Sequence, residues 1–106
     1  MGFFTSLKSP DINQGIREYQ AETNAVLLDV RTPQEYREGH IPGSVNLPLQ
    51  TIDKVTEIVE NMSTPLFVYC LSGSRSRQAA ESLKEIGYPS VKNIGGIGGY
   101  FGKVVQ

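Results

Sequence analysis

Apolar residues along this chain gather either in short continuous runs or at helical spacing. The runs at residues 25–28 and 66–70 are typical of strands buried on both faces of a sheet. A further run at residues 91–94 predicts a last strand, and residues 44–47 predict a brief one. Apolar residues recur at the three- and four-residue spacing of helices at positions 12–19, 52–62 and 79–86.

Capping residues predict where three of the helices begin. Ser9 precedes Pro10, so we expect an N-cap at Ser9 and a helix that continues to about residue 20. Thr32 and Pro33 open a second helix with the sequence of a capping box, and this helix must end by residue 39. Thr51 is expected to cap the helix whose apolar positions begin at residue 52.

The order of these elements predicts an α/β fold. Strands that alternate with helices on short connections imply a mostly parallel central sheet with helices on both faces. Gly87 is expected to end the helix over residues 79–86, Gly95-Gly96 to form a turn, and residues 98–105 to hold one final helical turn. Ligands of such sheets bind beyond the carboxyl ends of the strands. Cys70 ends a central strand and therefore lies where a site is expected.

Length and composition predict a single domain over residues 1–106, with 39% hydrophobic and 20% charged residues. The chain has a net charge of −1 and no cluster of basic residues, so it lacks the positively charged surface that is typical of nucleic-acid-binding proteins. No apolar stretch approaches the ~18 residues of a membrane span, so we expect neither nucleic-acid nor membrane partners. One cysteine and one histidine cannot form an internal disulfide or complete a four-ligand zinc site. We therefore expect a reducing, cytoplasmic location, no metal and no cofactor.

The segment that begins at Cys70 has the composition of a tight loop leading into a helix. It reads Cys70-Leu71-Ser72-Gly73-Ser74-Arg75-Ser76. Such a loop turns successive backbone N–H groups toward one centre, and the helix adds its own unpaired N–H groups. Cysteines at helix N-termini can have pKa values of ~3.5–7.5 instead of ~8.5. A lone cysteine is more often a small core residue, but the polar residues that follow favour a nucleophile whose persulfide the same cradle would hold.

Cys70 is thus the predicted catalytic residue, and the rest of the loop is the predicted substrate-binding site. A cation in the first turn of a helix opposes the helix dipole slightly, which favours a function for Arg75 over simple solvation. That function would be to hold the sulfonate of an anionic sulfur donor in a forked contact. Gly73 is expected to supply a positive φ that lets the donor approach the backbone. The other residues expected to line the cradle are Leu71, Ser72, Ser74 and Ser76.

Three sequence blocks resemble the rhodanese family, over nearly the whole chain. They are LDVRTPQEY and GHIPGS at residues 28–36 and 39–44, the loop Cys70-x-x-Gly73-x-Arg75-Ser76, and the pair Gly95-Gly96. The resemblance implies a single rhodanese domain with a parallel sheet wrapped by helices. It also implies a thiosulfate sulfurtransferase activity. Sulfane sulfur would pass from thiosulfate or a similar donor, through a Cys70 persulfide, to cyanide or a thiol, including that of a thioredoxin-like or sulfur-carrier protein.

The same resemblance places four charged or titratable residues in a scaffold block, where they brace one another behind the site. These residues are Asp29, Arg31, Glu35 and His40. His40 is accordingly expected to be a turn histidine with satisfied hydrogen bonds, not a general base. Members of the family often carry a tryptophan shortly after the Gly-Gly pair. This chain has Tyr100-Phe101 there, which we interpret as a substituted packing aromatic.

Two other functions are compatible with a reactive cysteine loop. Cysteine phosphatases and arsenate reductases use a Cys-x5-Arg loop, which needs an arginine at the position of Ser76. The loop of this chain brings Arg75 one residue earlier and holds no carboxylate to serve as a general acid. The other alternative is a non-enzymatic sulfur carrier or redox-sensing module, which also needs a thiol of low pKa. Multiple turnover distinguishes an enzyme from a carrier.

Overall fold

The computed structural model describes residues 10–106 and centres on a four-stranded sheet with the order β2-β1-β3-β4. Its strands are β1 (Val26–Asp29), β2 (Val45–Asn46), β3 (Leu66–Cys70) and β4 (Val91–Gly96). Every neighbouring pair is parallel. The predicted α/β fold with a parallel central sheet is therefore confirmed.

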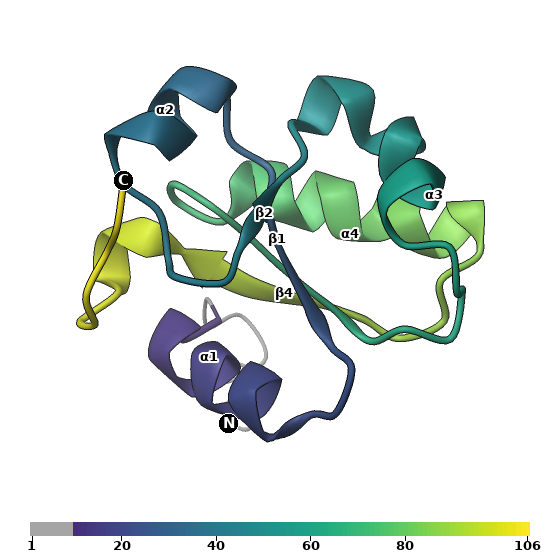
Figure 1. Ribbon diagram of the computed structural model, residues 1–106, viewed down its shortest axis with the longest axis horizontal. Coiled ribbons are helices and arrows are strands. Elements are labelled where there is room, and N and C mark those ends of the chain that lie inside the picture. The colour runs from purple at the N-terminus through teal and green to yellow at the C-terminus, as the bar shows by residue number, and fades with distance from the viewer. Residues whose placement is uncertain (1–9) are drawn as a thin grey trace, which may run out of the picture.

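Helices cover both faces of this sheet. Figure 1 shows α1 on one side of the sheet and α3 and α4 on the other. The α-helices are α1 (Ile12–Ala21), α2 (Pro33–Glu38), α3 (Val55–Ile58) and α4 (Ser74–Ile86). Two 3₁₀ segments, η2 (Leu49–Lys54) and η3 (Ile97–Gly99), complete the described elements. None of the helices in residues 10–106 is both long and apolar enough to cross a membrane.

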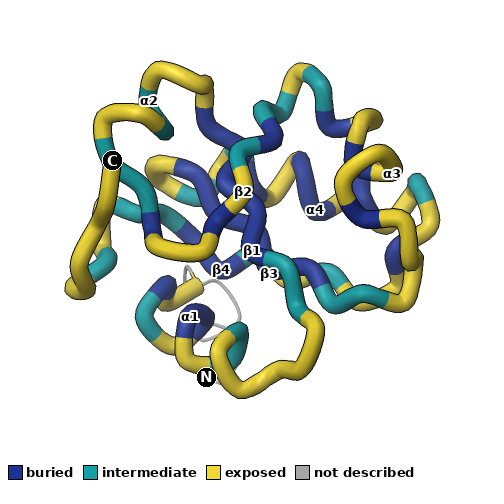
Figure 2. The backbone as a smooth tube through the Cα atoms, viewed as in Figure 1, coloured by how far each residue is buried: buried dark blue, intermediate teal, exposed yellow. Residues whose placement is uncertain are grey.

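Side chains of β3 alternate between two apolar cores, one on each face of the sheet. Phe67 and Tyr69 pack in the core that α1 covers, whereas Val68 and Cys70 belong to the core that α4 covers. All five residues of β3 are buried, as expected for a central strand between two helical layers. Figure 2 shows the buried residues along the strands and on the helix faces that meet them. This alternation places the Cys70 side chain on the same face as α4.

The ends of α1 and α2 test the capping predictions. The N-cap of α1 is Asp11, whose carboxylate accepts the backbone N–H of Asn13 at 3.0 Å, so the predicted start was wrong by two residues. Ser9, the expected cap, lies outside the described residues. The capping box of α2 is confirmed, because Thr32 caps the helix and Pro33 is its first residue.

The prediction of one helix from Thr51 to residue 62 was wrong. Thr51 has non-helical φ and ψ inside η2, and its hydroxyl donates to the carbonyl of Pro48 instead of capping a helix. Only one α-helical turn, α3, follows. Ile52, Val55 and Val59 are nevertheless buried, so the apolar spacing identified three core positions, whereas Ile58 and Met62 of the same pattern are exposed. A kinked 3₁₀ segment also places residues three or four positions apart on one face, so it fits the same apolar spacing as an α-helix.

The Gly95-Gly96 pair was predicted to be a turn, but both glycines belong to β4. A register shift occurs there: Val68 pairs with Asn93, and the next residue of β3 pairs with Gly95. The shift needs the positive φ of 104° at Gly95, which glycine adopts without strain. The final helical turn predicted over residues 98–105 is present only as the short η3, and beyond it the chain forms a β-bridge between Val105 and His40.

Candidate active site

Cys70 lies at the junction between β3 and α4. Only residues 71–73 separate the strand from the helix, and Gly73 turns the chain with a φ of 105°, as predicted. The backbone N–H of Gly73 donates to Cys70 Sγ at 3.0 Å. Cys70 itself is buried, with an exposed fraction of 0%.

The surroundings of Cys70 favour its thiolate. Burial raises the pKa of the thiol, but hydrogen bonding lowers it by more, so that the pKa lies below its ordinary value. The lowering comes from the hydroxyl of Ser76 and from the backbone N–H groups of Ser76, Gly73 and Ser72. These N–H groups belong to the loop and to the first turn of α4, where helix N–H groups have no partner within the helix. The loop is therefore an anion cradle around Sγ.

Asn93 on β4 joins this cradle to the sheet, a role that sequence reasoning missed. Its side-chain oxygen accepts the Ser76 hydroxyl at 2.7 Å and the backbone N–H of Gly95 at 3.0 Å. Its amide nitrogen lies 3.4 Å from the carbonyl of Gly73, to which it donates. An asparagine two residues before a glycine is a signal for such a local side-chain turn, but the partner Ser76 is distant in sequence.

The loop after Cys70 rests directly on the backbone of Gly96. A Cβ at this position would lie 2.3 Å from the carbonyl oxygen of Leu71 and 2.7 Å from Ser72 Cα. Gly96 itself has extended φ and ψ of −116° and 139°, which any residue can adopt. Glycine is therefore required here for space and not for backbone freedom.

The predicted substrate-binding residues divide into buried and exposed positions. Ser76 is fully buried beside the thiol, while the side chains of Leu71, Ser72 and Ser74 are exposed. A hollow of about 390 Å³ lies against Leu71 and Ser72, next to the thiol loop. It is lined by Pro10, Asp11, Ile12, Leu71, Ser72, Gly96, Gly98 and Gly99. A larger hollow lies against the opposite end of β3, at Leu66.

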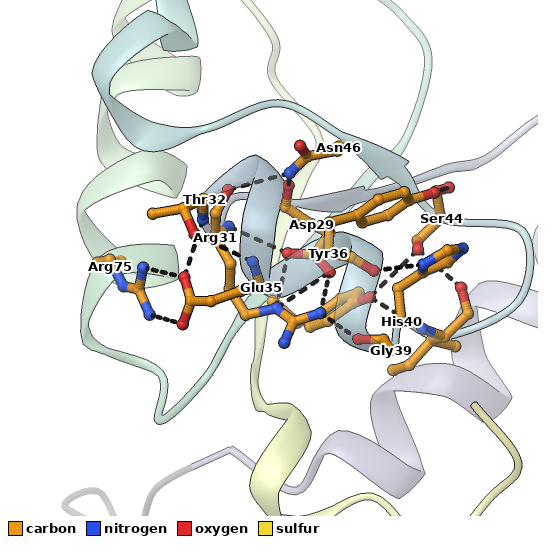
Figure 3. Close-up of polar contacts among 12 residues, drawn as sticks. Asp29, Arg31, Thr32, Glu35, Tyr36, Gly39, His40, Ser44, Asn46 and Arg75 are labelled. Atoms are coloured by element: carbon orange, nitrogen blue, oxygen red, sulfur yellow. Dashed lines mark hydrogen bonds and ion pairs between the residues drawn. The ribbon is translucent and has the colours of Figure 1, made fainter. Parts of the chain in front are cut away.

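Arg75 points toward α2, where its guanidinium forms a forked ion pair with Glu35 (Figure 3). The two nitrogen–oxygen distances are 2.9 and 3.0 Å. The hydrogen bonds from Arg75 lower the pKa of Glu35 to about 2, against the smaller effect of burial. The fork predicted to hold a donor sulfonate is thus occupied by a carboxylate, and Glu35 is a partner of the loop that the sequence did not reveal.

The scaffold block lies behind this ion pair. Asp29 is fully buried, and its carboxylate accepts hydrogen bonds from two side-chain nitrogens of Arg31. Arg31 also donates to the carbonyl of Gly39. His40 stacks on Tyr36, with ring centroids 3.6 Å apart, and its Nδ1 lies 2.8 Å from the Tyr36 carbonyl (Figure 3). Asp29 and Arg31 thus brace each other and His40 is a turn histidine, as predicted, but Glu35 pairs with Arg75 and not with the other members of the block.

The described residues offer no cluster from which a metal site could be built. In residues 10–106, no group of three or more His, Cys, Asp or Glu side chains is arranged to hold a metal ion. The chemistry that this arrangement can carry out is nucleophilic attack by the Cys70 thiolate, with anionic products held by loop N–H groups.

Comparison with known proteins identifies the class to which this fold and site belong. The model of the rhodanese-like domain matches residues 13–102, so the chain belongs to the rhodanese-like domain family. It is similar to the thiosulfate sulfurtransferase PspE of Escherichia coli, with 38% identity over 66% of this chain and 68% of that protein. The putative sulfur carrier protein YrkF of Bacillus subtilis is 41% identical over 64% of this chain, which spans 36% of that longer protein.

A solved structure supports the same assignment. The structure described as a rhodanese with anions from E. coli has a TM-score of 0.72 and 34% identity to this chain. The match covers 77% of this chain and 98% of that one.

Proposed function

We propose that this chain is a sulfurtransferase that carries sulfane sulfur as a persulfide on Cys70, within one rhodanese domain spanning residues 1–106. The observation that carries the proposal is the cradle around Sγ. Backbone N–H groups of Ser72, Gly73 and Ser76 favour an anion at this position, although the thiol is buried. The position at the carboxyl end of a central parallel strand is also where ligands of such folds bind.

The proposed reaction has two steps. The Cys70 thiolate attacks the sulfane sulfur of the donor; with thiosulfate, the S–S bond breaks and sulfite leaves with the bonding electrons. The terminal sulfur of the new persulfide remains as an anion within reach of the loop N–H groups. Cyanide or a thiol then attacks that sulfur, forming thiocyanate or a new persulfide and returning Cys70 as its thiolate. No general base is needed if the thiol is already ionised.

The remaining loop residues have proposed roles in binding. Ser76 and Gly73 hold the anionic sulfur, and Ser72 adds its backbone N–H. Leu71 and Ser74 are exposed and are proposed to contact the donor or the acceptor from the solvent side. Arg75 is proposed to attract an anionic substrate. Its ion pair with Glu35 weakens that attraction.

The names of the relatives support this chemistry and leave open the donor and the acceptor. PspE is named a thiosulfate sulfurtransferase, which favours thiosulfate or a similar small donor. Acceptors would be cyanide in an assay and a small thiol, or a thioredoxin-like or sulfur-carrier protein, in the cell. We propose the cytoplasm as the compartment because a single cysteine has no partner for an internal disulfide.

A sulfur carrier is the second candidate function, favoured by the similarity to YrkF, which is named a putative sulfur carrier protein. A carrier would load one sulfur per chain and release it only to a specific partner. Steady-state thiocyanate formation from thiosulfate and cyanide distinguishes the two. Many turnovers per chain support the enzyme, and a single burst limited to one sulfur per chain supports the carrier. Cys70→Ser is the control for both, because a hydroxyl cannot form a persulfide.

A further inference from the structure

The guanidinium of Arg75, which follows the thiol loop at the start of α4, is already paired in the free protein. Both terminal nitrogens of Arg75 donate to the carboxylate of Glu35. The exposed fraction is 30% for the Arg75 side chain and 27% for that of Glu35. Glu35 also accepts the backbone N–H of Thr32 in the capping box of α2, so α2 fixes its position. A doubly charged donor would therefore meet an arginine whose charge is compensated and whose fork is occupied.

Arg77, two residues beyond Arg75 on α4, is exposed to solvent, and the other charged groups around the site are paired or acidic. Arg31, the other arginine of the adjoining scaffold block, is 5% exposed and is paired with Asp29. The hollow beside Leu71 and Ser72 has one charged residue among those that line it, the acidic Asp11.

We propose that Glu35 is a specificity-determining residue, which weakens the use of thiosulfate relative to the persulfide of an organic thiol. This inference rests on the proposed function and names its donor class. In a thiol persulfide the sulfane sulfur is bonded to a sulfur of an organic group, with no sulfonate to compete with Glu35 for Arg75. The Cys70 thiolate attacks the outer sulfur of R–S–SH, and the S–S bond breaks. The leaving thiolate takes the proton as R–SH, while Cys70 keeps the persulfide anion.

The test compares two donors, thiosulfate and the persulfide of 2-mercaptoethanol, whose organic group is uncharged. The measured quantity is the ratio of kcat/KM for thiosulfate to kcat/KM for the persulfide, with cyanide as acceptor. Glu35→Gln removes the charge, but its amide oxygen can still accept the Thr32 N–H, so the capping box is kept. Glu38→Gln, at the exposed end of the same helix, is the matched control.

We expect Glu35→Gln to raise this ratio about fivefold to tenfold, mainly through a lower KM for thiosulfate, while Glu38→Gln keeps the parent's ratio. Arg75→Gln, which leaves the carboxylate of Glu35 without its partner, should lower the ratio about fivefold or more and tests the proposal even if Glu35→Gln fails to fold. An unchanged or lower ratio in folded Glu35→Gln, or an unchanged ratio in Arg75→Gln, overturns the specificity role while sulfur transfer itself persists. Absence of transfer from both donors in the parent overturns the proposed function and, with it, this inference.

Discussion

Replacement of Gly96 by alanine tests whether β4 sets the position of the loop after Cys70. The added Cβ would lie 2.3 Å from the Leu71 carbonyl oxygen, whereas ordinary contacts begin near 3.4 Å. Both colliding groups, this oxygen and Ser72 Cα, belong to the backbone of the loop, so no flexible side chain can turn away. The loop must therefore move by about 1 Å, and misplacement of reacting groups by this distance can cost about 10²-fold in rate.

We expect Gly96→Ala to lower kcat/KM for thiocyanate formation by about 10²-fold, equivalent to about 2.7 kcal/mol of transition-state stabilisation. The steric conflict should also lower the free energy of unfolding by about 1–3 kcal/mol, the usual cost of overpacking. The assay uses the better of the two sulfur donors with cyanide, alongside urea unfolding of each variant.

Gly98→Ala is the matched control, because a Cβ at Gly98 would lie 3.5 Å from the same Leu71 oxygen, an ordinary contact. This variant should keep activity within about threefold of the parent, since a contact at that distance displaces nothing. A folded Gly96→Ala protein with the activity of Gly98→Ala would refute the argument that close contact with β4 positions the loop.

Three further perturbations follow from the structure. Ser76→Ala should raise the pKa of Cys70, since the Ser76 hydroxyl lowers it; an unchanged midpoint of iodoacetamide alkylation against pH would contradict this. Tyr88→Phe removes the hydrogen bond from a buried phenol to the Val59 carbonyl and should cost about 1 kcal/mol in urea unfolding; no loss would show that the bond is not stabilising. Glu35 has a folded pKa of about 2 against an ordinary 4.5, so its stabilisation is present above pH 4.5 and is lost as pH falls toward 2. Glu35→Gln should make the free energy of unfolding depend less on pH across that window. An equal pH dependence in the parent and the variant would exclude the effect.

The fold was predictable from sequence because its strongest signals are local. The runs that became β1 and β3 are buried on both faces, and the cap formed by Thr32 with Pro33 needs only neighbouring residues. The signal was ambiguous around Thr51, where a kinked 3₁₀ segment and an α-helix place apolar residues on the same face. The sequence was misleading at Gly95-Gly96, because glycine pairs are typical of turns. Gly96 is needed in β4 because the loop after Cys70 packs against the strand there, and this packing is tertiary.

The candidate site shows the same division. Cys70 and the positive φ of Gly73 follow from the strand–loop–helix sequence, which requires no knowledge of distant segments. The pairing of Arg75 with Glu35 joins residues 40 positions apart, and Asn93 reaches Ser76 across 17 positions. Such contacts depend on how α2 and β4 pack beside the loop, and a single sequence carries no direct signal for them.

The proposed Cys70 persulfide is detected by the intact mass of the protein after exposure to a sulfur donor, together with the mass of the peptide that contains Cys70. Thiosulfate and the persulfide of 2-mercaptoethanol are each added, excess donor is removed, and the mass is measured before and after cyanide. We expect the parent to gain the mass of one sulfur atom on the peptide containing Cys70, and cyanide to remove it as an equal amount of thiocyanate. Cys70→Ser should gain none. A parent that gains no sulfur from either donor, or a Cys70→Ser protein that still forms thiocyanate, would contradict the proposed persulfide.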